Sequence, residues 1–338
     1  MWLKGRLSKS WPALLVVMAL AISACGAGDP VTVYSGRTEN LIEPLLEAFT
    51  EETGIEVAVK YGNSADLALL ISEEGARTPA DVFISQSPGA VGFLVEAGMM
   101  GGLDSGLLDL VEPRFRNGDG RWVGLSGRVR VLVFNQEMVD PTDLPNSVFD
   151  LTEPKFEGRI GLAPANGSFQ DFVTAMREIH GDDRTLTWLQ GLEANNAATY
   201  QNNTAIVQAV GRGEVAMGLV NHYYNFRIRA EDPAHPTGNY YFPGGDIGSL
   251  LIATAAGVLA DSDQAADANR LIEYLLGAEA QSFFAEETLE YPLAAGVPPA
   301  GSLPALETLN AATYDFDRLG GGLERTRELI DASGLEAP

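Results

Sequence analysis

The chain has 338 residues, and its 46 acidic and 22 basic side chains give a formal net charge of −24 at pH 7. Because nucleic acid and anionic lipid surfaces repel a chain with this much negative charge, neither is expected as a partner. The length predicts two domains, and a single cysteine excludes an internal disulfide and a thiolate metal site.

The first 24 residues have the pattern of a secretory signal peptide. Basic side chains precede an apolar run at 11–22 that is too short to span a bilayer. Small residues then precede Cys25, which resembles the lipidated cysteine of bacterial lipoproteins. This resemblance implies that cleavage leaves Cys25 as a lipid-bearing N-terminus, followed by a linker over 25–30. The alternative is a plain signal peptide with a chance cysteine.

The next part of the chain alternates β and α patterns. Alternating and β-branched runs predict strands, whereas 3.6-residue periodicity predicts helices. The expected strands are 31–35, 55–61, 80–85 and 128–135, and the expected helices are 39–54, 65–76 and 88–97. Such alternation predicts an α/β fold with a mostly parallel sheet and helices on both faces.

A second α/β block follows. Strands are expected at 159–164, 215–220 and 250–259, and helices at 168–180, 185–193 and 266–288. The long strands 128–135 and 250–259 are candidate hinges between two lobes. On this interpretation lobe 1 comprises 31–127 with 256–303, and lobe 2 comprises 128–255 with 304–338.

Four polar segments follow expected strands. They are SGRTEN from residue 35, QSPG from 86, ANGS from 165 and NHYYN from 221. Ligands of open α/β sheets bind at the carboxyl ends of the strands. The sequence therefore predicts that these segments meet in one binding cleft between the lobes.

Two tyrosines are adjacent in the last of these segments, Tyr223 and Tyr224. Neighbouring side chains diverge on a regular strand or helix, so two phenols converge only where the backbone is irregular, as at a strand-to-helix turn. The alternative is that one ring packs in a core and the other lies on the surface.

The order and spacing of eight segments resemble those of the bacterial ferric-ion-binding proteins. The segments are VTVYSGRTEN, TGIEVAV, TPADVFIS, LSGRVRVLVFN, GRIGLAPANGSF, NNTAIVQAVGRGE, NHYYNF and LEYPLAAGV, and they cover nearly all of 31–338. The resemblance implies a two-lobed periplasmic-binding-protein fold of type II, hinged around a cleft. It also implies an extracytoplasmic protein that delivers Fe³⁺ to the permease of an ABC transporter, often together with a synergistic anion.

The resemblance assigns roles to particular residues. Tyr223 and Tyr224 match two phenolate ligands of Fe³⁺, whose charge would displace the phenol protons. Phosphate or carbonate would lie at a helix N-terminus, held by Asn166, Gly167, Ser168, Asn203 and Asn221. Without the resemblance, ANGS reads as a capped turn and Asn203 as a turn residue.

The first lobe departs from the family pattern. Family members often carry a histidine and then a tyrosine where this chain has Thr38 and Glu39, and some carry a glutamate where it has Gln86. A third family tyrosine is replaced by Phe169. Glu39, water or a chelator would then complete the iron shell. Glu39 is equally expected in a first helical turn, where the helix dipole favours an acidic side chain.

Five further residues, two arginines and three histidines, have an expected role or position. Arg128 and Arg130, in a hinge strand, either assist an anion or form a structural salt bridge. His222 is expected to cap or pack and not to bind metal, and His180 and His235 are expected at the surface.

The main alternative function is the binding of a small organic anion, such as a phosphonate, sugar phosphate or polycarboxylate. An enzyme is not expected, because the chain has no nucleophile elbow, HExxH motif or P-loop. A lipid-anchored sensor without a transport role is also compatible with the sequence. The expected state is a monomer at the outer face of the cytoplasmic membrane, with a small inorganic ligand and a permease as its partners.

Overall fold

The structure is a computed structural model that describes residues 28–294, 296–301, 303–306 and 322–335. The expected signal peptide and Cys25 lie outside these residues. Among the described helices, none has the length and apolar character needed to cross a membrane.

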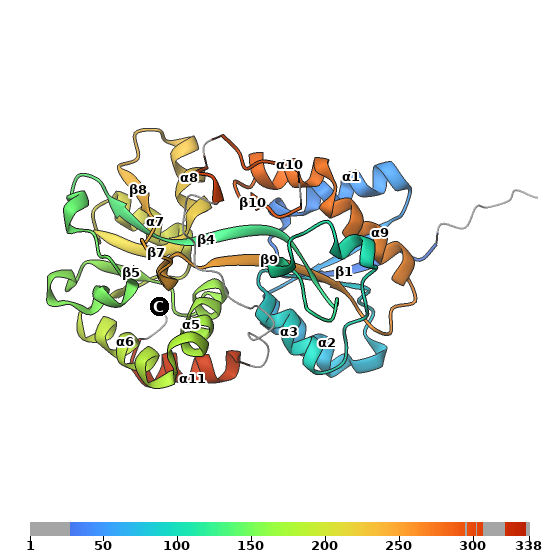
Figure 1. The fold of residues 1–338 in the computed structure, drawn as a ribbon, viewed down its shortest axis with the longest axis horizontal. Helices are drawn as coiled ribbons and strands as arrows, with labels where there is room; N and C mark the ends of the chain where they lie inside the picture. The colour runs from blue at the N-terminus through green and yellow to red at the C-terminus, as the bar shows by residue number, and fades with distance from the viewer. Residues whose placement is uncertain (1–27, 295, 302, 307–321, 336–338) are drawn as a thin grey trace, which may run out of the picture.

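Two α/β lobes lie side by side and are joined by long strands (Figure 1). Lobe 1 contains β1 (Val31–Ser35), β2 (Val57–Tyr61), β3 (Val82–Ser85), α1 (Glu43–Thr53), α2 (Ser64–Glu74), α3 (Pro88–Glu96) and α4 (Ser105–Leu108). Lobe 2 contains β5 (Ile160–Leu162), β6 (Ala198–Thr199), β7 (Met217–Asn221), β8 (Thr237–Tyr240), α5 (Gly167–His180), α6 (Asp182–Ala194), α7 (Asn203–Gly211) and α8 (His222–Glu231). The two-lobed α/β prediction is confirmed.

The lobes are connected by β4 (Val123–Asn135) and β9 (Leu251–Val258), which run from one lobe into the other (Figure 1). The strand order in the sheet is β2-β1-β3-β9-β4-β7-β5-β6, with β8 and β10 (Tyr291–Pro292) also paired to β4. Every residue of β4 is buried. It begins five residues before the predicted strand and carries an irregularity between Gly124 and Ser126.

The sheet is mixed and not mostly parallel. Strand pairs within each lobe are parallel, as for β1 with β2 and β3, and for β5 with β6 and β7. All pairs that involve β4 or β9 are antiparallel. The prediction missed this because β4 and β9 pass between the lobes without the helical crossovers that parallel pairing requires.

Helices cover both faces of the lobe 1 sheet, as predicted. Val31 and Val33 pack with Phe49 of α1 in one core cluster, whereas Tyr34 points to the other face and packs with Val91 of α3. The alternation along β1 is therefore buried on both sides.

The predicted helix 266–288 is wrong as a single helix. It is divided into α9 (Ala265–Leu276) and α10 (Ala278–Glu286) at Gly277, whose backbone is extended with φ −68° and ψ 160°. The last described helix, α11 (Leu323–Ser333), packs against α5 and α6 in lobe 2 (Figure 1).

Candidate functional site

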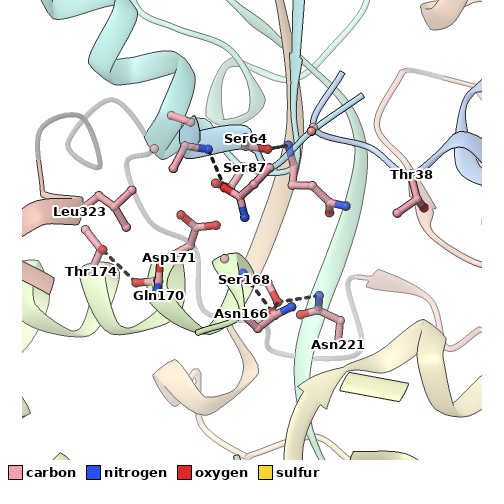
Figure 2. A pocket seen from close by; sticks show the side chains of 18 of the residues that line it. Thr38, Ser64, Ser87, Asn166, Ser168, Gln170, Asp171, Thr174, Asn221 and Leu323 are labelled. Atoms are coloured by element: carbon pink, nitrogen blue, oxygen red, sulfur yellow. Dashed lines mark hydrogen bonds between the residues drawn. The ribbon is translucent and has the colours of Figure 1, made fainter. Parts of the chain in front are cut away.

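A cavity of about 240 Å³ lies between the lobes, and we call it the α5 cavity (Figure 2). All four polar segments predicted to meet contribute to its lining. They supply Gly36 and Thr38, then Gln86 and Ser87, then Asn166 to Ser168, and Asn221 with Tyr224. The prediction of one interlobe cleft at the carboxyl ends of the strands is confirmed, because β1, β3, β5 and β7 all end at this cavity.

Close packing of the backbone shapes the lobe 1 side of this cavity. The Oγ of Ser64 accepts a hydrogen bond from the Gln86 N–H at 2.9 Å. A side chain at Gly36 would collide with that same Ser64 hydroxyl. Glycine at this position therefore lets the end of β1 approach the N-terminus of α2.

A second cavity of about 510 Å³ adjoins the first, and we call it the α8 cavity because residues of that helix line it. Four residues line both cavities: Thr38, Gln86, Asn166 and Tyr224. The junction between the cavities thus lies beside the tyrosine pair and is contacted by both lobes.

The tyrosine pair occupies a strand-to-helix turn. β7 ends at Asn221 and α8 begins at His222, so Tyr223 and Tyr224 fall in the first helical turn. Their rings are stacked, with centroids 4.2 Å apart. Tyr224 is half-buried, whereas Tyr223 is 1% exposed and its Oη finds no hydrogen-bond partner within the described chain.

Burial holds Tyr223 in its neutral form. It raises the pKa of this phenol well above its ordinary value, and the neighbouring Tyr224 and Glu290 act in the same direction. The charges of Arg128 and Arg37 oppose this shift without overcoming it. Burying a hydroxyl without a hydrogen-bond partner costs free energy of folding. Tyr223 is therefore a candidate ligand for a cation that can displace its proton.

Four of the five residues expected to hold an anion form one hydrogen-bond network. The Oδ1 of Asn166 accepts from the Ser168 hydroxyl at 2.6 Å and from the Asn203 amide at 3.3 Å. The Asn221 amide donates to the Ser168 Oγ at 3.3 Å, and Arg130 donates to the Asn221 Oδ1 at 3.2 Å. The network surrounds the N-terminus of α5, where backbone N–H groups and the helix dipole attract negative charge.

The five predicted residues differ in their access to the cavities. Asn166, Gly167, Ser168 and Asn221 line the α5 cavity, and Asn166 is the N-cap of α5. Asn203 is buried at the start of α7 and lines neither cavity. Its amide reaches the site only indirectly, through the hydrogen bond that orients the Asn166 side chain.

Glu39 is exposed and lines neither cavity, although its neighbours Thr38 and Asn40 both line the α8 cavity. Its role as a ligand stays a prediction. Over the part of the chain that the structure describes, no group of three or more His, Cys, Asp and Glu side chains is placed to hold a metal.

His222 is fully buried and both ring nitrogens are engaged. Its Nδ1 accepts from the Val129 N–H at 3.0 Å, and its Nε2 lies 2.9 Å from the carbonyl of Leu289, to which it donates. Burial lowers the pKa of this ring to about 4. His222 therefore ties the tyrosine turn to β4 as a neutral side chain, and this agrees with its predicted packing role.

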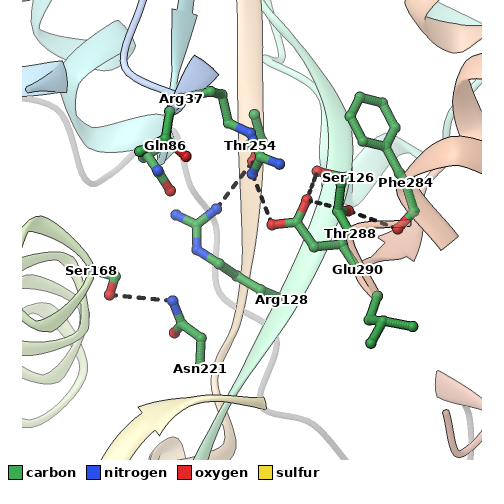
Figure 3. Close-up of polar contacts among 12 residues, drawn as sticks. Arg37, Gln86, Ser126, Arg128, Ser168, Asn221, Thr254, Phe284, Thr288 and Glu290 are labelled. Carbon is green, nitrogen blue, oxygen red and sulfur yellow. Dashed lines mark hydrogen bonds and ion pairs between the residues drawn. The ribbon is translucent and has the colours of Figure 1, made fainter. Parts of the chain in front are cut away.

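Three arginines, Arg37, Arg128 and Arg130, are buried close enough to the tyrosine pair to interact with it electrostatically. Figure 3 shows Arg37 and Arg128 with their partners Glu290 and Thr254. Arg37 forms an ion pair with Glu290 at 2.8 Å, and Arg128 and Arg37 each donate to the Thr254 hydroxyl at 3.1 Å. Burial alone would raise the pKa of Glu290, but Arg37 and Arg128 hold it below its ordinary value. Burial, with the charge of Arg128, lowers the pKa of Arg130 to about 9.

Sequence reasoning considered Arg128 and Arg130 but missed Arg37 and Glu290. Arg37 lies within the quoted SGRTEN segment, whereas Glu290 is distant in sequence and only the fold brings it to the site. The Nε and Nη2 atoms of both Arg37 and Arg128 are buried without a partner among the described residues. The buried arginines therefore place positive charge close to the two phenols.

Asp171 was also missed. It projects from α5 into the α5 cavity, towards the lobe 1 segments that carry Ser64 and Ser87 (Figure 2). Burial raises the pKa of Asp171 to about 6, against the opposing effects of the Ser87 hydrogen bond and of Arg128 and Arg130. The available signal was its position three residues after Ser168, which places both on one helix face.

The chain is similar to known proteins in sequence and in fold. A family profile described as bacterial extracellular solute-binding protein matches residues 77–320. An Fe(3+)-binding periplasmic protein of Serratia marcescens is 31% identical over 98% of this chain and 100% of its own length. The structure of iron-bound HitA from Pseudomonas aeruginosa has a TM-score of 0.86 at 32% identity, covering 90% of this chain and 99% of that one. A Trichodesmium protein in complex with iron and citrate ligands has a TM-score of 0.78 at 29% identity, over 91% and 100% of the two chains.

Proposed function

The chain belongs to the family of bacterial extracellular solute-binding proteins, and from this premise we propose that it captures Fe³⁺ outside the cytoplasmic membrane and delivers it to an ABC permease. It is a binding protein and not an enzyme. The ferric-ion-binding relatives extend over nearly the whole chain, which supports the same cargo here.

The observation that carries the proposal is the buried Oη of Tyr223, which has no hydrogen-bond partner within the described part of the chain and lies beside a stacked second phenol. Fe³⁺ is a small, hard cation for which phenolate is a suitable ligand, and a strongly charged metal displaces ligand protons. Tyr223 and Tyr224 would supply two phenolates, and the arginines behind them would offset the new negative charge.

A synergistic anion would bind beside the metal. Asn166, Gly167, Ser168 and Asn221 line the cavity at the N-terminus of α5, and phosphate or carbonate suits such a site. Asn203 would act by positioning Asn166. Glu39, water or a chelator would complete the metal shell, near Thr38 and Gln86 at the junction of the two cavities.

The remaining parts of the proposal concern the location and partners. We place the protein at the outer face of the cytoplasmic membrane, attached through a lipid on Cys25, and working as a monomer with its permease. The apolar run before Cys25 and the periplasmic relatives support this placement.

The test is a visible absorption titration of the full-length chain with ferric iron, with and without phosphate or carbonate. Phenolate bound to Fe³⁺ gives a charge-transfer band that neither partner has alone. We expect the band to saturate at one iron per protein and to disappear in Tyr223→Phe and in Tyr224→Phe. No band with any anion would reject iron capture, and thermal-shift screening of phosphonates, sugar phosphates and polycarboxylates would then test organic-anion binding.

A further inference from the structure

The α5 cavity is larger than one inorganic anion requires. Its volume of about 240 Å³ corresponds to roughly eight water molecules at about 30 Å³ each. A tetrahedral anion at the N-terminus of α5 would leave the far part of this cavity to water. The far part is lined by Asp171 and Thr174 of α5 and by Ser64 and Ser87 of lobe 1 (Figure 2).

The charge within the cavity is also uneven. At one end, Ser168, Asn221 and the buried Arg130 favour a negative group. Asp171 lies one helical turn further along the same face of α5, about 5–6 Å away. A second negative group would be repelled there, whereas an O–H donor could bond to the carboxylate, and such charge-assisted hydrogen bonds are the stronger kind.

We propose, on the basis of the iron-binding function above, that the co-ligand is a small organic acid with a hydroxyl group beyond its metal-chelating end. Its carboxylate lies at the N-terminus of α5 beside Ser168, and its distal hydroxyl donates to Asp171. Asp171 thereby selects a hydroxylated co-ligand over inorganic phosphate.

The test compares two co-ligands that share an α-hydroxy acid chelating end, glycerate and lactate, of which only glycerate has a distal hydroxyl. The full-length chain is titrated with ferric iron and each co-ligand, and the charge-transfer band is measured. Because a hydrogen bond to a charged group is among the stronger ones, we expect half-saturation at about tenfold less glycerate than lactate. In Asp171→Ala this ratio should fall to about one, and phosphate should support iron binding better than it does in the wild type.

Asp261→Ala is the matched control, because Asp261 is exposed in the turn after β9 and should leave the ratio unchanged. Comparing the wild type with each variant cancels the difference in solution stability between the two ferric complexes. If Asp171→Ala fails to fold, Asp171→Asn preserves the side-chain size, and the loss of charge should still reduce the ratio.

Two results would overturn the inference, and they differ in what they leave standing. A ratio of half-saturating lactate to glycerate that stays unchanged in the Asp171 variants would reject the co-ligand while iron capture stands. Absence of the band with phosphate, glycerate and lactate alike would reject iron capture and the co-ligand together.

Discussion

Tyr223 has a buried hydroxyl with no hydrogen-bond partner among the described residues, although buried polar groups are nearly always hydrogen-bonded. Phenylalanine at this position would give a more stable fold, because it has no hydroxyl to bury. Under the proposed function, the hydroxyl is present because it is a ligand of Fe³⁺. Its stacked neighbour Tyr224 lines both cavities. Tyr224 therefore presents a second phenol oxygen at a position that is more exposed to solvent.

We predict that Tyr223→Phe loses the iron band without loss of fold stability. Removing an unpaired buried hydroxyl should raise the free energy of unfolding by about 1 kcal/mol in the absence of iron. Denaturant unfolding checks the stability and the visible titration checks the binding. The control is Tyr240→Phe, since the Tyr240 hydroxyl donates to the Pro145 carbonyl at 2.8 Å. That variant should lose about 1 kcal/mol and keep the band; the reverse pattern would contradict the assignment.

Asp171 predicts a second effect, on the pH dependence of stability. Its pKa is about 6 in the folded chain, against about 3.9 unfolded, so the folded state binds the proton more tightly. The associated stability is present below about pH 4 and is lost as the pH rises through 6. Asp171→Asn should therefore be more stable than the wild type at pH 7.5, by up to about 2–3 kcal/mol, and the difference should shrink towards pH 4.

Thermal unfolding of the iron-free proteins between pH 4.5 and 7.5 measures this difference. Asp261→Asn is the control, and its stability relative to the wild type should not change over the range. A pH-independent difference for Asp171→Asn would mean that the carboxyl is not perturbed by its surroundings.

Helices and strands contribute to the site through residues at their ends. Away from the site, the break between α9 and α10 is where the local sequence pattern gave a wrong prediction, a single helix. The residues 266–288 are amphipathic throughout, so periodicity alone extends the helix across Gly277. A buried side chain of α10 joins this turn to a segment that is distant in the chain. Gln281 of α10 is fully buried and donates to the carbonyls of Leu125 and Leu275, at 2.9 and 2.8 Å.

The same Gln281 side chain accepts from the N–H groups of Leu293 and Ala294 at 2.9 and 3.0 Å. Gln281→Leu would leave four buried backbone groups unpaired, and we expect it to lower the free energy of unfolding by about 3 kcal/mol or more. Urea unfolding measures the change. Gln190→Leu, at an exposed position of α6, should stay within about 0.5 kcal/mol, and equal effects of the two substitutions would show that the buried network contributes little.

At the scale of the whole molecule, ligand capture depends on how the two lobes meet. Both lobes line the α5 cavity, and β4 and β9 are the long strands that join them. A ligand that contacts both lobes stabilises the arrangement in which they are close, because it binds that arrangement more tightly.

We therefore predict that iron with its co-ligand makes the molecule more compact. Small-angle X-ray scattering of the full-length chain should give a smaller radius of gyration with iron than without it. Tyr223→Phe under identical conditions should show no change. A wild-type radius that stays constant at saturating iron would contradict closure on the ligand.

The α/β pattern, the meeting of four strand ends at one cleft and the position of the tyrosine pair can all be predicted from the amino-acid sequence. These follow from local periodicity and from the rule that binding sites lie at the carboxyl ends of strands. Other features become evident only in the folded chain. They are the antiparallel pairing of β4 and β9, the break at Gly277, and the contacts of Arg37 with Glu290 and of Asp171 with the cavity. Each of these features depends on contacts between residues that are distant in the chain. Such contacts form, and set the burial and electrostatic environment of the side chains, only when the chain is folded.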